Sequence, residues 1–91
     1  MKKDAQFYFA NLGADVARCV SAAQMNDETR YQDSLARSYR TLSYLRTAQR
    51  PEAYEEGMLL LRGLQEAKET NHVLDFGLHS SALMAQYSLI I

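Results

Sequence analysis

Apolar side chains recur every three or four positions along most of the chain, which is the spacing of one face of an α-helix. The strict alternation typical of a half-buried strand is absent over any useful window. Breaks in the pattern predict a single all-α domain over residues 1–91, with helices at about residues 4–25, 27–48, 51–70 and 72–90. Helices of similar length joined by short connections favour an up-down antiparallel four-helix bundle.

The expected helix ends follow from local chemistry. Asp4 is suited to an N-cap, and the acidic residues after Asn26 suit the positive end of a second helix. Pro51 disfavours helical geometry at the residue before it and fits the first position of a third helix. Thr70 and Asn71 form the next break, as a cap or as a left-handed turn.

Each of the first three segments carries one apolar stripe that we expect to form the core. The stripes are Tyr8, Phe9, Leu12, Val16, Cys19, Val20 and Ala23; Tyr31, Leu35, Ser38, Leu42 and Leu45; and Ala53, Gly57, Leu60, Leu61 and Leu64. Leu59 falls among glutamates, so we expect it outside the core.

The last segment is apolar on two opposite sides. One side, expected to face the core, consists of Phe76, Leu83, Tyr87 and Ile90, flanked by Val73 and Met84. The other consists of Leu74, Leu78, Ala82, Ala85 and Leu89. A helix that is apolar nearly all round is a buried helix, but a bundle of this size cannot surround one of its own helices. We therefore expect an oligomer, with a homodimer as the default because closed twofold assemblies are the commonest.

The first segment has a weaker second face made of Phe7, Ala10, Ala14, Ala17, Ser21 and Met25. Small side chains at this spacing let another helix approach closely, although alanines are also good helix formers on a solvated face. Both interpretations stay open. The predicted oligomer interface therefore combines Phe7, Ala10 and Ala14 with Leu74, Leu78, Ala82, Ala85 and Leu89.

A membrane-spanning last helix is the alternative to an oligomer, since residues 73–91 approach the length of a bilayer span. Asp75, His79 and Gln86 would then lie in or near hydrocarbon, and no Lys or Arg follows the stretch. We therefore predict no membrane partner.

Composition and charge exclude several classes of protein. The chain is 47% hydrophobic, which is too apolar for a disordered protein, and its net charge of -1 lacks the overall basic field of a dedicated nucleic-acid module. The single cysteine excludes an internal disulfide, and the N-terminus does not resemble a signal peptide. These features predict a cytoplasmic protein.

Charge is uneven along the middle of the chain. Residues 34–50 contain four arginines and no acidic residue, whereas five glutamates dominate residues 51–70. Arg30, Arg37, Arg40 and Tyr44 share the side of their helix away from its apolar stripe, and we call them the Arg/Tyr face. It is a solvated surface, a protein interface or an RNA-binding surface, since Arg and Tyr serve in both kinds of recognition.

Catalytic patterns are missing from the sequence. No phosphate-binding glycine loop is present, and Cys19 lies on an apolar stripe, where a free cysteine is usually a small buried hydrophobe. Glu69 and His72 have the E-x-x-H spacing of di-iron bundles, with Asp75 and His79 on the same side, but the other ligands of such a site are absent. We therefore predict no catalytic, cofactor or metal site, and a non-enzymatic oligomerisation or protein-interaction module: an adaptor, regulator or accessory subunit. The alternative function is an RNA-binding bundle that uses the Arg/Tyr face. A metal-dependent enzyme at Glu69, His72, Asp75 and His79 is a third hypothesis, since a homodimer would double the motif.

Overall fold

The computed structural model describes residues 4–88, and the side chains of residues 4–85. Four helices follow one another along the chain: α1 (Ala5–Gln24), α2 (Glu28–Thr47), α3 (Pro51–Glu69) and α4 (Val73–Ser88). The predicted all-α class with four helices is confirmed, and the expected boundaries agree with the observed ones within about two residues where both are described. Leu89 and Ile90 lie outside the described residues.

The helix ends use the expected residues. The Asp4 carboxylate accepts the backbone N–H of Phe7 at 3.0 Å, and Asp27 accepts that of Arg30 at 3.1 Å. Pro51 is the first residue of α3. Each of the three turns contains a non-glycine residue with positive φ, namely Asn26, Gln49 and Asn71. Of the two alternatives for the third turn, the backbone at Asn71 (φ 60°) is left-handed.

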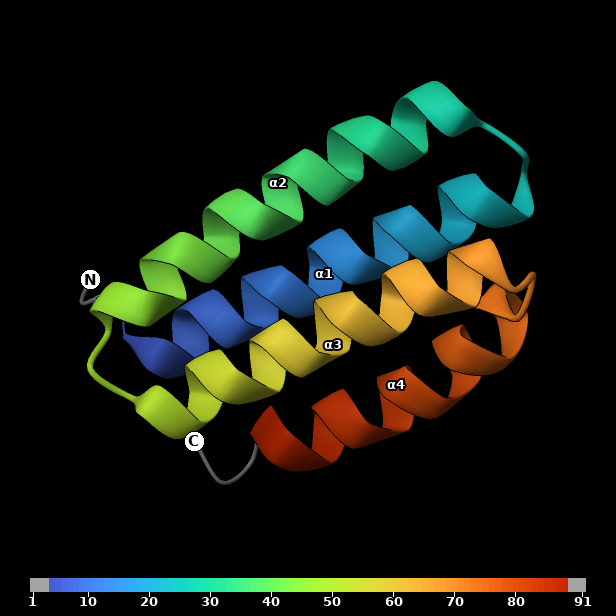
Figure 1. Ribbon diagram of the computed structural model, residues 1–91. Helices are drawn as coiled ribbons and strands as arrows, with labels where there is room; N and C mark the ends of the chain where they lie inside the picture. The colour runs from blue at the N-terminus through green and yellow to red at the C-terminus, as the bar shows by residue number, and fades with distance from the viewer. Residues whose placement is uncertain (1–3, 89–91) are drawn as a thin grey trace.

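Helix α1 occupies the central place in the fold. It packs most extensively against α2 and also contacts α3 and α4, whereas α2 and α4 do not meet within the described part of the chain. Figure 1 shows α1 between α2 and α3, with α4 at the edge next to α3. The core is therefore built around one side of α1, and α4 covers only part of what remains.

The buried core follows the predicted stripes of the first three helices. Its fully buried large side chains are Leu12, Leu45, Leu61 and Leu64, joined by Cys19 and Ser38. Leu35, Leu60, Val20 and Ala23 are partly buried against this cluster, and Leu59 is exposed as expected. Periodicity alone thus identified the inner side of three helices.

The inner side of α4 agrees with the expected one in part. Phe76, Met84 and Val73 are partly buried, as expected for the core face and its flanks. Leu83, which we also placed there, has 52% of its surface exposed, whereas Ser80 is buried. The side chain of Tyr87 and residue Ile90 lie outside the described part of the chain. Leu83 was misplaced because the line of α4 that faces the rest of the chain passes through Gly77 and Ser80, whose small side chains an apolar pattern does not mark.

A buried polar contact joins α1 to α2. Asp15 is buried, and its Oδ2 accepts a hydrogen bond of 2.7 Å from the hydroxyl of Thr41. Its Oδ1 lies 3.0 Å from Nη1 of Arg18, one turn along the same helix. Both carboxylate oxygens therefore have partners, which a buried charge requires.

We predict that Thr41→Val destabilises the protein by about 1–3 kcal/mol, because it leaves one buried carboxylate oxygen without its partner. Thermal unfolding followed by circular dichroism measures the effect. Thr47→Val is the matched control, since its hydroxyl bonds only the Tyr44 carbonyl on the surface of the same helix. Equal stability of the Thr41 and Thr47 variants would show that the buried contact contributes nothing.

Tyr31 and Lys68 connect α2 to α3. The Tyr31 side chain is buried, and Nζ of Lys68 lies 4.7 Å from its ring centroid while also pairing with Glu28 at 2.9 Å. Burial, followed by smaller effects of the negative forms of Cys19 and Glu28, raises the pKa of Tyr31 to about 12. The neutral phenol is therefore the form that the fold favours.

This pKa predicts an alkaline limit to folding. Because the pKa of Tyr31 is higher in the folded than in the unfolded chain, its contribution to stability is complete below about pH 10 and is lost as the pH rises to about 12. Denaturant unfolding between these pH values should show a steeper loss of stability for the parent than for Tyr31→Phe, which removes only the titrating hydroxyl. Parallel curves would contradict the assignment.

Candidate protein-interaction surface

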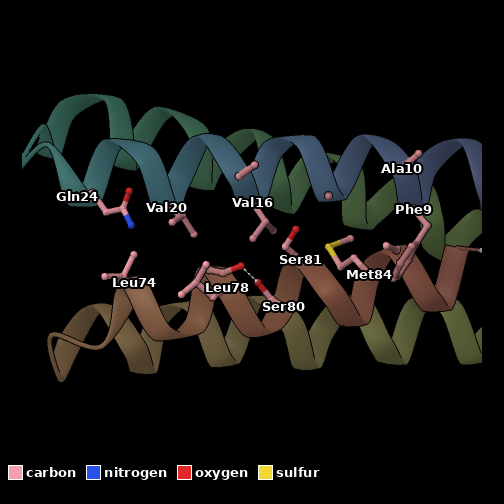
Figure 2. Close-up of a pocket in the computed structure, with 14 residues that line it drawn as sticks. Phe9, Ala10, Val16, Val20, Gln24, Leu74, Leu78, Ser80, Ser81 and Met84 are labelled. Atoms are coloured by element: carbon pink, nitrogen blue, oxygen red, sulfur yellow. Dashed lines mark hydrogen bonds between the residues drawn. The ribbon is translucent and has the colours of Figure 1, made fainter.

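An apolar groove runs along the outer side of the α1–α4 pair. It has a volume of about 660 Å³ and is lined by residues from these two helices alone. The α1 residues are Phe9, Ala10, Gly13, Val16, Ala17, Val20 and Gln24, and the α4 residues are Leu74, Gly77, Leu78, Ser80, Ser81, Met84 and Ala85. In Figure 2 the side chains of Val16, Val20 and Gln24 extend from α1, and those of Leu74, Ser81 and Met84 from α4, into the space between the two helices.

Two close approaches between the helices fix the floor of the groove. A Cβ atom added to Gly77 would lie 2.8 Å from Cγ1 of Val20, and one added to Gly13 would lie 2.9 Å from Cε of Met84. Both distances are shorter than ordinary van der Waals contact. At Gly77 the neighbour is the stiff side chain of Val20, so the absence of a Cβ lets the helices approach, whereas at Gly13 the neighbour is the flexible end of Met84. The same contacts set the register, in which Phe9 and Ala10 lie near Met84 while Gln24 lies near Leu74 (Figure 2).

The structure brings half of the predicted interface residues into this groove. Ala10, Leu74, Leu78 and Ala85 line it. Ala14 and Ala82 are exposed and Phe7 is half-buried, but none of the three is part of the lining. Leu89 lies outside the described residues. The two helix faces that the sequence singled out separately are therefore neighbours in the fold.

Leu74 and Leu78 are the exposed large apolar residues of this surface. Their exposed fractions are 59% and 70%, which leaves two large apolar groups facing solvent on one stretch of α4. Exposed apolar residues are ordinary when scattered singly, but contiguous ones typically mark binding surfaces.

The groove contains few polar groups. None of its lining residues is charged, and the hydroxyl of Ser80 donates to the carbonyl oxygen of Gly77 at 3.5 Å within the same helix. An apolar, uncharged surface of this kind can bind another apolar surface. Its polar lining side chains are Gln24, Ser80 and Ser81.

Sequence reasoning missed the residues that form the floor of the groove. Phe9, Val16 and Val20 were assigned to the core stripe, and they serve both the core and the groove. Two isolated glycines, Gly13 and Gly77, were the available signal. A glycine within a helix costs stability relative to alanine unless close packing requires it.

The Arg/Tyr face lies on the opposite side of α1 from α4. Arg30, Arg37, Arg40 and Tyr44 are all exposed, and the ring of Tyr44 lies 5.6 Å from that of Tyr8 on α1. Arg37 and Arg40 have no acidic partner within the described part of the chain. The ion pair observed between α2 and α3 joins Glu28 of α2 to Lys68 of α3. Among the described residues, Arg37 and Arg40 therefore do not connect α2 to the glutamates of α3.

The weak metal candidates do not assemble into a site. Glu69, His72, Asp75 and His79 are exposed, and residues 4–85 contain no group of three or more His, Cys, Asp or Glu side chains placed to hold a metal ion. Cys19 is buried as expected, with Sγ 3.8 Å from Oγ of Ser38. Burial raises the pKa of the Cys19 thiol, which disfavours the reactive thiolate.

A second exposed apolar area lies on the α3 side of α4. Leu59 and Leu83 border a smaller hollow of about 170 Å³, together with Glu56 and His79. Ionisable side chains interrupt this surface, unlike the groove between α1 and α4. Through residues 4–88, no helix has both the length and the apolar content needed to cross a bilayer.

Comparison with known proteins gives no further guide. No protein-family model, curated protein or solved structure matches this chain.

Proposed function

We propose that this protein is a non-enzymatic, oligomeric helical module of the cytoplasm, an up-down antiparallel bundle that acts by protein association as an adaptor, regulator or accessory subunit. The observation that carries the proposal is the exposure of Leu74 and Leu78 beside an uncharged groove. Removing apolar surface from water stabilises an association by about 25 cal/mol per Å². The α1–α4 surface is the place where this chain has such surface to bury.

Self-association is the most direct form of this function, because an interface between identical chains resembles a domain core and is more apolar than a transient one. The described groove has that character, with aliphatic side chains at its rim and small residues between them. A partner bearing charges at the same place would leave them without a counter-charge, since the groove supplies none.

We predict that the parent protein has a solution mass above 10.4 kDa by light scattering at tens of micromolar, and that Leu78→Glu returns it to this monomer mass. A buried, unpaired carboxylate costs several kcal/mol, so association should weaken by at least about 100-fold. The fold should survive, because Leu78 is exposed within one chain.

Leu59→Glu is the matched control for this experiment. Leu59 is also exposed, but it lies on α3 and does not line the groove. Its substitution should leave the mass unchanged. A parent protein that is monomeric under these conditions, or a Leu78 variant with the parent's mass, would contradict the proposal.

The Arg/Tyr face supports a second candidate function, binding to single-stranded RNA. Its specific basis is that Arg37 and Arg40 are exposed on the same helix side as the exposed Tyr44, with no ion pair to an acidic residue among residues 4–85. Guanidinium groups contact phosphates and aromatic rings stack on bases. Oligomerisation would duplicate this basic surface on a chain whose net charge is only -1.

If this second function operates, a labelled RNA oligonucleotide binds at low salt, and the logarithm of affinity falls with the logarithm of salt concentration by about 0.7 per phosphate contacted. Arg37→Glu should reduce both the affinity and this slope. Arg46→Glu changes the net charge equally from another side of α2 and should have a smaller effect. Absence of binding at low salt, or equal effects of both variants, excludes the Arg/Tyr face as an RNA-binding surface.

A further inference from the structure

Three aromatic rings lie together where the start of α1 runs beside the end of α2 (Figure 1). The ring centroids of Tyr8 and Tyr44 are 5.6 Å apart, and those of Phe7 and Tyr8 are 5.4 Å apart with the rings edge to face. These separations are typical of paired aromatic rings. We call Phe7, Tyr8 and Tyr44 the aromatic cluster. Tyr44 has 48% of its surface exposed, although Tyr8 supports its ring from the neighbouring helix.

Two arginines continue from this cluster along α2. Arg40 and Arg37 precede Tyr44 by four and seven residues, so they share its side of the helix and lie about 6 and 10 Å from it along the axis. Both are exposed, and neither forms an ion pair with an acidic residue among residues 4–85. A nucleotide carries its base and its phosphate on different parts of one sugar. A ring and a guanidinium group one helical turn apart can therefore contact both.

The charges beside the cluster are complementary to a phosphate backbone. Asp33 is the acidic residue on this side of α2, and it lies about 16 Å from the cluster along the helix axis. Asp4 is closer, but its carboxylate caps α1 by accepting the N–H of Phe7, and the positive end of that helix offsets its charge. A protein partner would need acidic residues at matching positions, whereas RNA carries a phosphate at every nucleotide.

From these features we propose that the aromatic cluster is a base-stacking site for single-stranded RNA, in which a base stacks on Tyr44 and the adjoining phosphates bind Arg40 and Arg37. This inference rests on the second candidate function and extends its surface from α2 onto α1. Tyr8 is a positioning residue, because its ring packs against Tyr44 and restricts that side chain before RNA binds. Stacking accepts any base, so the site has little sequence preference.

Replacing the Tyr44 ring separates stacking from charge. The probes are a short oligouridylate and inorganic polyphosphate, a polyanion without bases, and calorimetry at low salt measures the affinity for each. Tyr44→Ala should weaken oligouridylate binding by about 5- to 100-fold, which is the range of one lost base–aromatic stack. It should leave polyphosphate binding unchanged. Tyr44→Phe retains the ring and should bind both probes as the parent does.

Tyr39→Ala is the matched control. Tyr39 lies on the same helix and is similarly exposed at 45%, but its hydroxyl donates to Oε1 of Gln65 on α3, away from the cluster. Its substitution should leave the affinity for oligouridylate unchanged. Circular dichroism measures whether each variant is folded. Tyr44→Leu keeps an apolar side chain against Tyr8 and provides the same test if alanine destabilises the fold.

The outcomes separate the stacking site from the RNA-binding function. If the parent binds oligouridylate but Tyr44→Ala has no effect, or weakens both polyanions equally, the stacking site is overturned while RNA binding stands. Equal effects at Tyr39 and Tyr44 also overturn the site. Failure of the parent to bind oligouridylate at low salt overturns both, and a lower solution mass of Tyr44→Ala would then assign the cluster to a protein contact. A loss of affinity confined to oligouridylate and to Tyr44 supports both.

Discussion

Helix α4 approaches α1 closely at glycine residues. This contact determines which apolar side chains of α4 are exposed. Gly77 packs against Val20 so closely that a Cβ atom on Gly77 would lie 2.8 Å from Cγ1 of Val20, whereas Gly13 lies against the flexible end of the Met84 side chain. Gly77 and Ser80 lie on the inner line of α4, with Phe76 and Met84 partly buried beside them. Leu78 and Leu83 fall on the two flanks of this line and are exposed.

The rest of the fold is organised so that α1 serves two surfaces. One side of α1 packs against α2, with a buried hydrogen bond between Asp15 and Thr41 and a neighbouring contact between Cys19 and Ser38. These polar contacts join the two helices at defined positions, because a shift between them would leave a buried carboxylate oxygen without a partner. The opposite side of α1 meets α4 and forms one wall of the groove.

Charge and apolar character are distributed to different parts of the molecule. The Arg/Tyr face exposes Arg37 and Arg40 on α2, while the groove between α1 and α4 contains no charged residue. A surface that lacks charge is selective for apolar partners, since any charged group placed there is desolvated without compensation. Because the groove is uncharged and the Arg/Tyr face is basic, we propose protein association for the groove and treat the Arg/Tyr face as a separate surface.

The sequence by itself determined the helical class, the positions of the turns and the inner side of three helices, because 3.6-residue periodicity and capping chemistry are local properties. It also placed Leu59 outside the core. The buried Asp15 and Thr41 were not among the predicted stripe residues, and nothing local showed that they meet. Only the tertiary structure placed Ser80 inside and Leu83 outside, since that choice depends on the close approach of Gly77 to a neighbouring helix. The groove itself was likewise beyond the sequence, because its two walls come from opposite ends of the chain and meet only through packing.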